Sequence, residues 1–155
     1  MTNRSFFGGL VPAATKLAQL LVRTSVGVGG EQVIVGIPAS WDSGEIDGLI
    51  ETLGELQVTE DDALRAFLSL PDISAGTDNI MESFHEAFAG TYETEEAALR
   101  ALSPLEEWET SLADWCIDHG IDFDTLEWNY ESLMNRLRDI SDLVEAEGRI
   151  HAFVR

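Results

Sequence analysis

Nine carboxylates lie in one stretch of the chain, residues 105–131, which contains no lysine or arginine. Three tryptophans, Trp108, Trp115 and Trp128, are distributed among them. Groups of carboxylates serve proteins as acid and base in catalysis, as metal ligands, or as a charged binding surface. The carboxylates of this stretch are Glu106, Glu107, Glu109, Asp114, Asp118, Asp122, Asp124, Glu127 and Glu131.

The spacing of these carboxylates indicates neither catalysis nor metal binding. A calcium loop starting at Asp118 needs glycine at its sixth position and glutamate at its twelfth, which hold Phe123 and Asn129. The histidines lie far apart, and no nucleotide-binding or nucleophile motif is present. We therefore expect no catalytic residue, no metal and no cofactor, and a protein that is not an enzyme. An enzyme of unrecognised type stays open, and a strongly perturbed carboxylate in a pocket would be its sign.

The charge of the chain is strongly negative and unevenly distributed. The 155 residues include 29 acidic and nine basic residues, which gives a net charge of −20. Residues 1–30 contain three bases and no acid, whereas residues 31–155 contain all 29 acids and six bases. Direct binding to nucleic acid is disfavoured, because phosphate contacts need lysine and arginine. The single cysteine, Cys116, is expected to be buried, and no apolar run is long enough to span a membrane, so we expect a cytoplasmic protein.

Local patterns predict a mostly helical α+β chain with short strands. Residues 1–30 are interpreted as an arm, with an amphipathic helix over 11–23 and a flexible joint over 25–30. A small α/β unit over 31–76 and a helical unit over 77–155 with a C-terminal strand are expected to follow. Strands are predicted over 31–37 and 149–154, and helices over 43–56, 59–70, 77–90, 95–102, 104–119 and 124–138. Thr59, Thr77 and Thr94 are the expected N-terminal caps of the helices over 59–70, 77–90 and 95–102.

The helix over 104–119 is the element expected to position the carboxylates. Ser103 and Glu106 form a predicted capping box, and Gly120 is expected to end the helix. The spacing of four apolar residues predicts one buried face, formed by Leu105, Trp108, Leu112 and Trp115. The tryptophans would then anchor the helix, and its acids would form a rigid ridge on the other faces.

Such a ridge would present negative charge in the way that DNA does. B-DNA carries one charge per about 1.7 Å of axis, so the 23 net charges of residues 31–155 would span roughly 39 Å at that density. We therefore expect an elongated acidic protein that competes with DNA for channels lined by lysine and arginine.

Three segments resemble the ArdA family of antirestriction proteins, and the likeness is best over residues 80–155. They are FHEAFAGTYETEEAAL (84–99), WNYESLMNRLRD (128–139) and RIHAFVR (149–155). The resemblance implies an elongated, acidic protein of small α/β units in series, usually a homodimer. It also implies a phage- or plasmid-type DNA mimic that occupies the DNA site of type I restriction–modification enzymes in a bacterial or archaeal host. By matched position, it places Glu86, Glu93, Glu95, Glu96 and Glu131 on the acidic surface. The family's N-terminal unit has no counterpart in residues 1–30.

We expect the DNA-mimic surface to consist of Glu93, Glu95, Glu96, Glu106, Glu107, Glu109, Asp114, Asp118, Asp122, Asp124, Glu127 and Glu131. The expected partner is a DNA-binding protein complex, with a type I restriction–modification enzyme as the first expectation. Two alternatives stay open. The same acids could block a CRISPR complex, a repressor or a nucleoid protein. The acidity could also be an adaptation to high salt, although the acid-free residues 1–30 argue against that reading.

Overall fold

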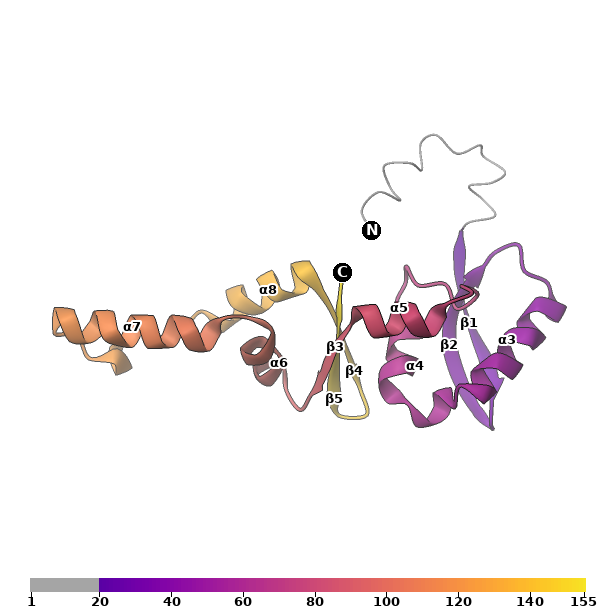
Figure 1. The fold of residues 1–155 in the computed structure, drawn as a ribbon, viewed down its shortest axis with the longest axis horizontal. Coiled ribbons are helices and arrows are strands. Elements are labelled where there is room, and N and C mark those ends of the chain that lie inside the picture. The colour runs from indigo at the N-terminus through magenta and orange to yellow at the C-terminus, as the bar shows by residue number, and fades with distance from the viewer. Residues whose placement is uncertain (1–19) are drawn as a thin grey trace, which may run out of the picture. The chain divides into compact units, whose positions relative to one another are not determined.

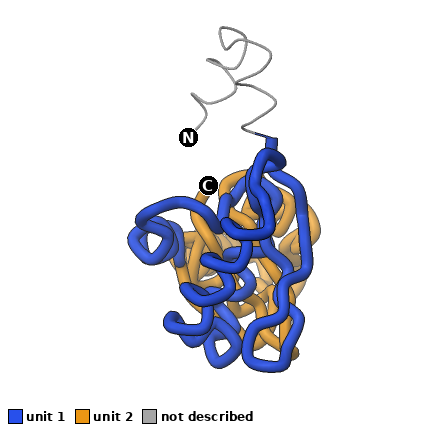
Figure 2. Tube along the Cα trace, turned by 90° about the vertical axis from the view of Figure 1, so that its right-hand side faces the viewer, with its two compact units in different colours: residues 1–88 blue, residues 89–155 orange. Residues whose placement is uncertain are grey.

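The computed structural model describes residues 20–155, which divide into two compact units, one ending at Phe88 and the other formed by Ala89–Arg155 (Figures 1 and 2). Six α-helices and five β-strands within the described residues confirm the α+β class. The boundaries differ from those expected, because the units divide after Phe88 rather than after residue 76. None of the helices between residues 20 and 155 is long and apolar enough to cross a membrane.

The first unit is built on an antiparallel hairpin of β1 (Leu21–Val28) and β2 (Glu31–Pro38). Gly29 and Gly30 connect the strands with φ angles of 57° and 84°, as a two-residue hairpin turn of this handedness requires. One face of the hairpin supplies buried side chains to the core of this unit, namely Val26, Val28, Val33, Val35 and Ile37.

The hairpin confirms one sequence prediction and corrects two. The strand expected over 31–37 is present as β2. The helix expected over 11–23 does not continue into residues 21–23, which lie in β1, and its earlier part falls outside the described residues. The flexible joint expected over 25–30 is wrong, because the alternating valines before the Gly-Gly turn pair with β2. Residues 21–30 therefore belong to the first unit and not to a separate arm.

Helical segments complete the core of the first unit. They are α3 (Ser43–Glu55), the 3-10 segment η1 (Val58–Glu60), α4 (Asp62–Leu68) and α5 (Ile80–Ala87). Helix α3 packs against β1, and α4 packs against β2. The Asp61 carboxylate accepts a hydrogen bond from the Leu64 backbone N–H at 3.0 Å, so Asp61, and not Thr59 as expected, caps α4. Thr77 is likewise not the cap of α5, whose N-cap position is Asn79.

The second unit joins a three-stranded sheet to three helices. Its elements are β3 (Phe88–Tyr92), α6 (Glu95–Leu102), α7 (Leu105–His119), the 3-10 segment η2 (Phe123–Thr125), α8 (Tyr130–Ile140), β4 (Ser141–Ala146) and β5 (Arg149–Val154). The strand order is β3-β5-β4, with β4 and β5 antiparallel. Leu99, Leu105, Met134 and Leu137 form a buried cluster among α6, α7 and α8.

Strands β3 and β4 were not expected from the sequence, whereas β5 confirms the strand over 149–154. Gly90 was predicted to end a helix, but it lies within β3 with a φ of 143°. The helix expected over 124–138 begins later, at Tyr130, after η2. Thr94 caps α6 as predicted, since its hydroxyl accepts a hydrogen bond from the Ala97 N–H at 3.0 Å.

Two glycine substitutions test the packing of the first unit. In Gly36→Ala, the added Cβ would lie 2.6 Å from the Ile73 carbonyl oxygen, next to the hydrogen bond from the Ala75 N–H to the Gly36 oxygen. We expect a loss of about 1–3 kcal/mol in the free energy of unfolding, because backbone must move. In Gly48→Ala, the added Cβ on α3 has no atom within 4 Å. The free energy of unfolding should therefore increase by about 0.5–1 kcal/mol, because alanine favours the helix over glycine. Urea denaturation of both variants checks this, and equal midpoints would contradict it.

Candidate functional site

Helix α7 is the element that carries the densest acidic segment. Figure 1 shows it extending away from the sheet of its own unit, with the chain returning alongside it after its C-terminus. Gly120 ends the helix as predicted, with a φ of 65°, and the Ile121 N–H donates to the Cys116 carbonyl at 2.9 Å. The N-terminus differs from the predicted capping box, because the Ser103 hydroxyl donates back to the Leu99 carbonyl at 2.6 Å.

The tryptophans of α7 are not its buried anchor, which corrects the sequence prediction. Leu105 and Cys116 are buried, the latter as expected, whereas Trp108 and Trp115 are 37% and 47% exposed. The Trp108 ring lies 6.5 Å from that of Trp128, between centroids. The buried stripe is centred on Leu105 and Cys116, so the tryptophans lie at its border.

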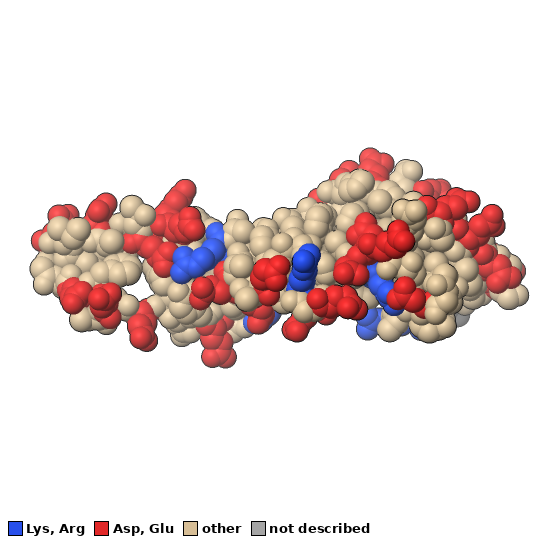
Figure 3. Space-filling model, turned by 90° about the horizontal axis from the view of Figure 1, so that it is seen from below, with Lys and Arg blue, Asp and Glu red and all other residues tan. Residues whose placement is uncertain are grey.

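Eight of the twelve expected site carboxylates are exposed and form no ion pair with any described residue. Glu106, Glu107, Asp114 and Asp118 lie on α7, and the others lie on the returning chain and at the start of α8: Asp122, Asp124, Glu127 and Glu131. The part of the second unit at the left of Figure 3, where α7 lies, shows acidic and uncharged atoms without basic ones on this face. Residues 101–135 contain no lysine or arginine, so these charges lie in a stretch of 35 residues without a lysine or arginine.

The other four expected site residues are paired with arginines of the same unit. Glu95 pairs with Arg138, and Glu93 pairs with Arg149 at 3.7 Å. Arg100 pairs with Glu96 at 3.7 Å and with Glu109 at 2.7 Å. Their charge is therefore partly compensated inside the chain, and the structure separates them from the eight unpaired carboxylates.

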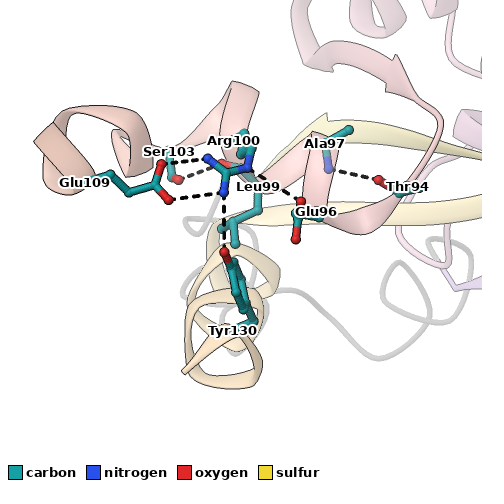
Figure 4. Close-up of polar contacts among 8 residues, drawn as sticks. All are labelled: Thr94, Glu96, Ala97, Leu99, Arg100, Ser103, Glu109 and Tyr130. Carbon is teal, nitrogen blue, oxygen red and sulfur yellow. Dashed lines mark hydrogen bonds and ion pairs between the residues drawn. The ribbon is translucent and has the colours of Figure 1, made fainter. Parts of the chain in front are cut away.

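Arg100 links three helices through its guanidinium group (Figure 4). Two of its nitrogens donate to the two Glu109 carboxylate oxygens, at 2.7 and 3.2 Å, and one also donates to the Tyr130 hydroxyl at 3.3 Å. The hydrogen bonds to Glu109, together with the negative charge of Glu109 and Glu96, raise the pKa of Arg100 above its ordinary value. The same bonds, helped by the charge of Arg100 and a hydrogen bond from Trp128, hold the pKa of Glu109 below its ordinary value, although partial burial opposes this. Glu109 thus fixes α7 to α6 and α8, a role that its sequence context did not reveal.

The structure contains further residues that sequence reasoning missed. His151 in β5 is 2% exposed, its Nδ1 lies 2.9 Å from the Thr91 hydroxyl, and its Nε2 has no hydrogen-bond partner among the described residues. Exposed apolar side chains also accompany the acids of α7. In the sequence, only the spacing of these apolar residues could have indicated them. Within residues 20–155, no group of three or more histidine, cysteine or acidic side chains is arranged to hold a metal ion.

Comparison with known proteins leaves the site to be interpreted from its own chemistry. No protein-family model matches the chain, and neither a curated protein nor a solved structure matches it.

The Glu109 pair predicts an acid-dependent part of the stability of the second unit. Because the pKa of Glu109 is lowered in the folded state, its stabilisation is present above the ordinary value of 4.5 and is lost as pH falls through the folded-state value. Glu109→Gln should therefore lower stability at pH 7, and its difference from the wild type should shrink below about pH 4.5.

Urea denaturation at pH 7 and in acid measures this difference. Glu107→Gln removes a neighbouring charge without an ion pair and serves as the matched control, which we expect to leave the pH 7 midpoint unchanged or slightly higher. Equal midpoints for Glu109→Gln and the wild type at pH 7 would show that the pair contributes nothing to folding.

Proposed function

We propose that this protein is a DNA mimic that inhibits a type I restriction–modification enzyme by occupying its DNA-binding channel. The observation that carries the proposal is the set of eight exposed, unpaired carboxylates on and beside α7, in a stretch of 35 residues without a basic side chain. A basic channel would supply the cations that the chain itself lacks there. Such an inhibitor acts by binding alone, in the cytoplasm of its host, and needs no catalytic step or cofactor.

The density of the unpaired charge supports a comparison with DNA. Helix α7 has 15 residues and is therefore about 22 Å long. B-DNA carries about 13 phosphate charges over that length. Eight carboxylates on α7 and the chain beside it amount to more than half of that number, which is sufficient to attract a channel built for phosphates.

The way in which α7 is held supports the same proposal. Flexible acids would lose conformational entropy on binding, and a mimic therefore gains from a stiff frame. The Arg100–Glu109 pair fixes the N-terminal half of α7, and Leu105 anchors its first turn in the buried cluster of the unit. At the other end, the Gly120 turn brings η2 back against the helix.

The target class rests on the resemblance to the ArdA family. The three resembling segments supply the last turn of α5, all of β3 and the start of α6, then most of α8, and finally β5. Strands β3 and β5 are neighbours in the sheet, and α6 packs against α8, so the resembling residues from Ala89 onward form a connected part of the second unit. An elongated arrangement and a homodimer belong to the proposal as features of that family.

A competition titration tests the target directly. The protein would be added to a type I methyltransferase core bound to labelled DNA, at about 50 and about 200 mM salt. We expect stoichiometric displacement of the DNA that weakens steeply as salt rises. Absence of displacement at both salt concentrations would exclude this target, and CRISPR complexes, repressors and nucleoid proteins would then be tested in the same format. A protein that unfolds without high salt would instead indicate salt adaptation.

Two triple variants with the same change of charge test which carboxylates carry the binding. Asp114→Asn/Asp118→Asn/Asp124→Asn removes three unpaired charges, and Glu93→Gln/Glu95→Gln/Glu96→Gln removes three that pair with arginines. Exposed ion pairs contribute about 0.2–1 kcal/mol each, so the first variant should bind about 3- to 160-fold more weakly, with a shallower salt dependence. The second variant should lose less. Equal losses would show that total charge, and not the unpaired surface, decides affinity.

A further inference from the structure

Exposed apolar side chains are concentrated in the same part of the chain as the unpaired acids. Twelve large apolar residues are exposed among the described residues, and seven of them lie between positions 108 and 130. These seven are Trp108, Trp115, Ile117, Ile121, Phe123, Leu126 and Tyr130. Single exposed apolar residues are ordinary, but a concentration of them in a soluble domain marks an interaction surface.

The far end of α7 and the turn after it hold most of this set. Residues 115–126, here called the α7 tip, contain five of the seven side chains, and Ile117 is 77% exposed. The Trp115 ring stacks on His119 with centroids 4.2 Å apart and an interplanar angle of 22°. His119 also holds the Trp115 carbonyl through its Nδ1 at 2.8 Å, so the two rings form an ordered aromatic platform. Because η2 packs against α7, the apolar side chains of the turn are held next to the helix.

Acids alternate with the apolar side chains of the α7 tip. Asp118, Asp122 and Asp124 are exposed and form no ion pair with a described residue. The sequence from residue 121 to residue 124 reads Ile-Asp-Phe-Asp, and all four residues are exposed, so the two kinds of side chain are close neighbours in one exposed segment. A role for charge alone does not explain the exposed apolar side chains. A surface that only mimics phosphates, or only resists salt, has no need of exposed isoleucine and tryptophan.

The chemistry of this surface selects the kind of partner that covers it. Two copies of the chain that met through the α7 tip would bring like charges together without any basic residue to separate them, which is unfavourable. A surface of arginines with apolar neighbours fits instead, because guanidinium groups pair with carboxylates and also stack on aromatic rings. The DNA-binding channel of a protein supplies arginines of this kind.

We propose that the α7 tip docks on the arginine-bearing channel of the target enzyme and inserts its apolar side chains between those arginines. This inference rests on the proposed function and adds to it a contact that DNA itself cannot make. The acids of the tip give an attraction that weakens with salt, whereas the apolar contact is insensitive to salt. The affinity of the protein for its target therefore has a part that persists at salt concentrations at which DNA is displaced.

Binding measurements with the full chain and a type I methyltransferase core separate the two parts. Trp115→Gln/Ile117→Gln should weaken binding about tenfold or more at both about 50 and about 200 mM salt, with an unchanged slope against salt. Ile140→Gln, which changes an isoleucine that is 61% exposed on α8, is the matched control and should bind as the wild type does. Asp118→Asn/Asp124→Asn should instead make the salt dependence shallower.

Each other outcome would overturn the inference. If the wild type binds and Trp115→Gln/Ile117→Gln binds equally well, the apolar side chains of the α7 tip do not contact the target. The DNA-mimic function would then still stand. If the wild type does not bind the core at either salt concentration, the docking and the proposed function both fall. If light scattering shows a wild-type dimer that the tip variant converts to a monomer, a second copy covers this surface. Thermal melts check folding, and Ile117→Gln alone replaces the double variant if the latter unfolds.

Discussion

The ion pair between Arg100 and Glu109 is the interaction on which the acidic part of the molecule depends. Arg100 is the last basic residue before a stretch of 35 residues that contains none. It uses two nitrogens on one carboxylate of α7 and reaches the Tyr130 hydroxyl of α8, so one side chain joins the three helices of the second unit. A bidentate pair of this kind fixes direction as well as distance, because the guanidinium group is planar and rigid.

The need for such a connection follows from the repulsion among the remaining acids. Unpaired carboxylates on a helix and on the chain beside it favour separation of the two. Three local interactions oppose this repulsion. Leu105 packs in the buried cluster, Cys116 is buried near the C-terminal end of α7, and backbone hydrogen bonds close the turn at Gly120. The unit thus uses one arginine and a small apolar core to hold charges that it does not neutralise. An arrangement of this kind is costly for folding alone and is useful where another molecule supplies the cations.

The elements that follow from local chemistry could be predicted from the sequence. The Thr94 cap of α6, the end of α7 at Gly120 and the strand over 149–154 each depend on a few neighbouring residues. Strand β1 was missed, because its valines were assigned to a helix and a joint when the Gly-Gly turn and the alternation before it already describe a hairpin. Strands β3 and β4 are short, and their pairing with β5 decides their conformation.

The candidate site shows the same division between local and distant information. Exposure of most of the acids follows from their type, but their pairing does not, because Arg138 and Arg149 lie far in the sequence from Glu95 and Glu93. The apolar spacing on α7 predicted one buried face, but of its four residues only Leu105 is buried, because periodicity alone does not tell which part of a stripe is covered. In the structure, Leu105 and Cys116 are buried, and Trp108 and Trp115 lie at the border of the buried stripe.

The exposed apolar side chains at that border would give the acidic surface selectivity among partners, which charge alone cannot provide. A protein that presented only carboxylates would be attracted to every basic channel in the cell, because Coulomb attraction at a distance does not distinguish one arginine-lined groove from another. Apolar side chains are selective in a different way, since they stabilise a complex only where the opposite surface is apolar and complementary in shape. With both on one helix end, the acids would increase the rate of encounter with the proposed target, and Trp115 and Ile117 would decide which encounters persist.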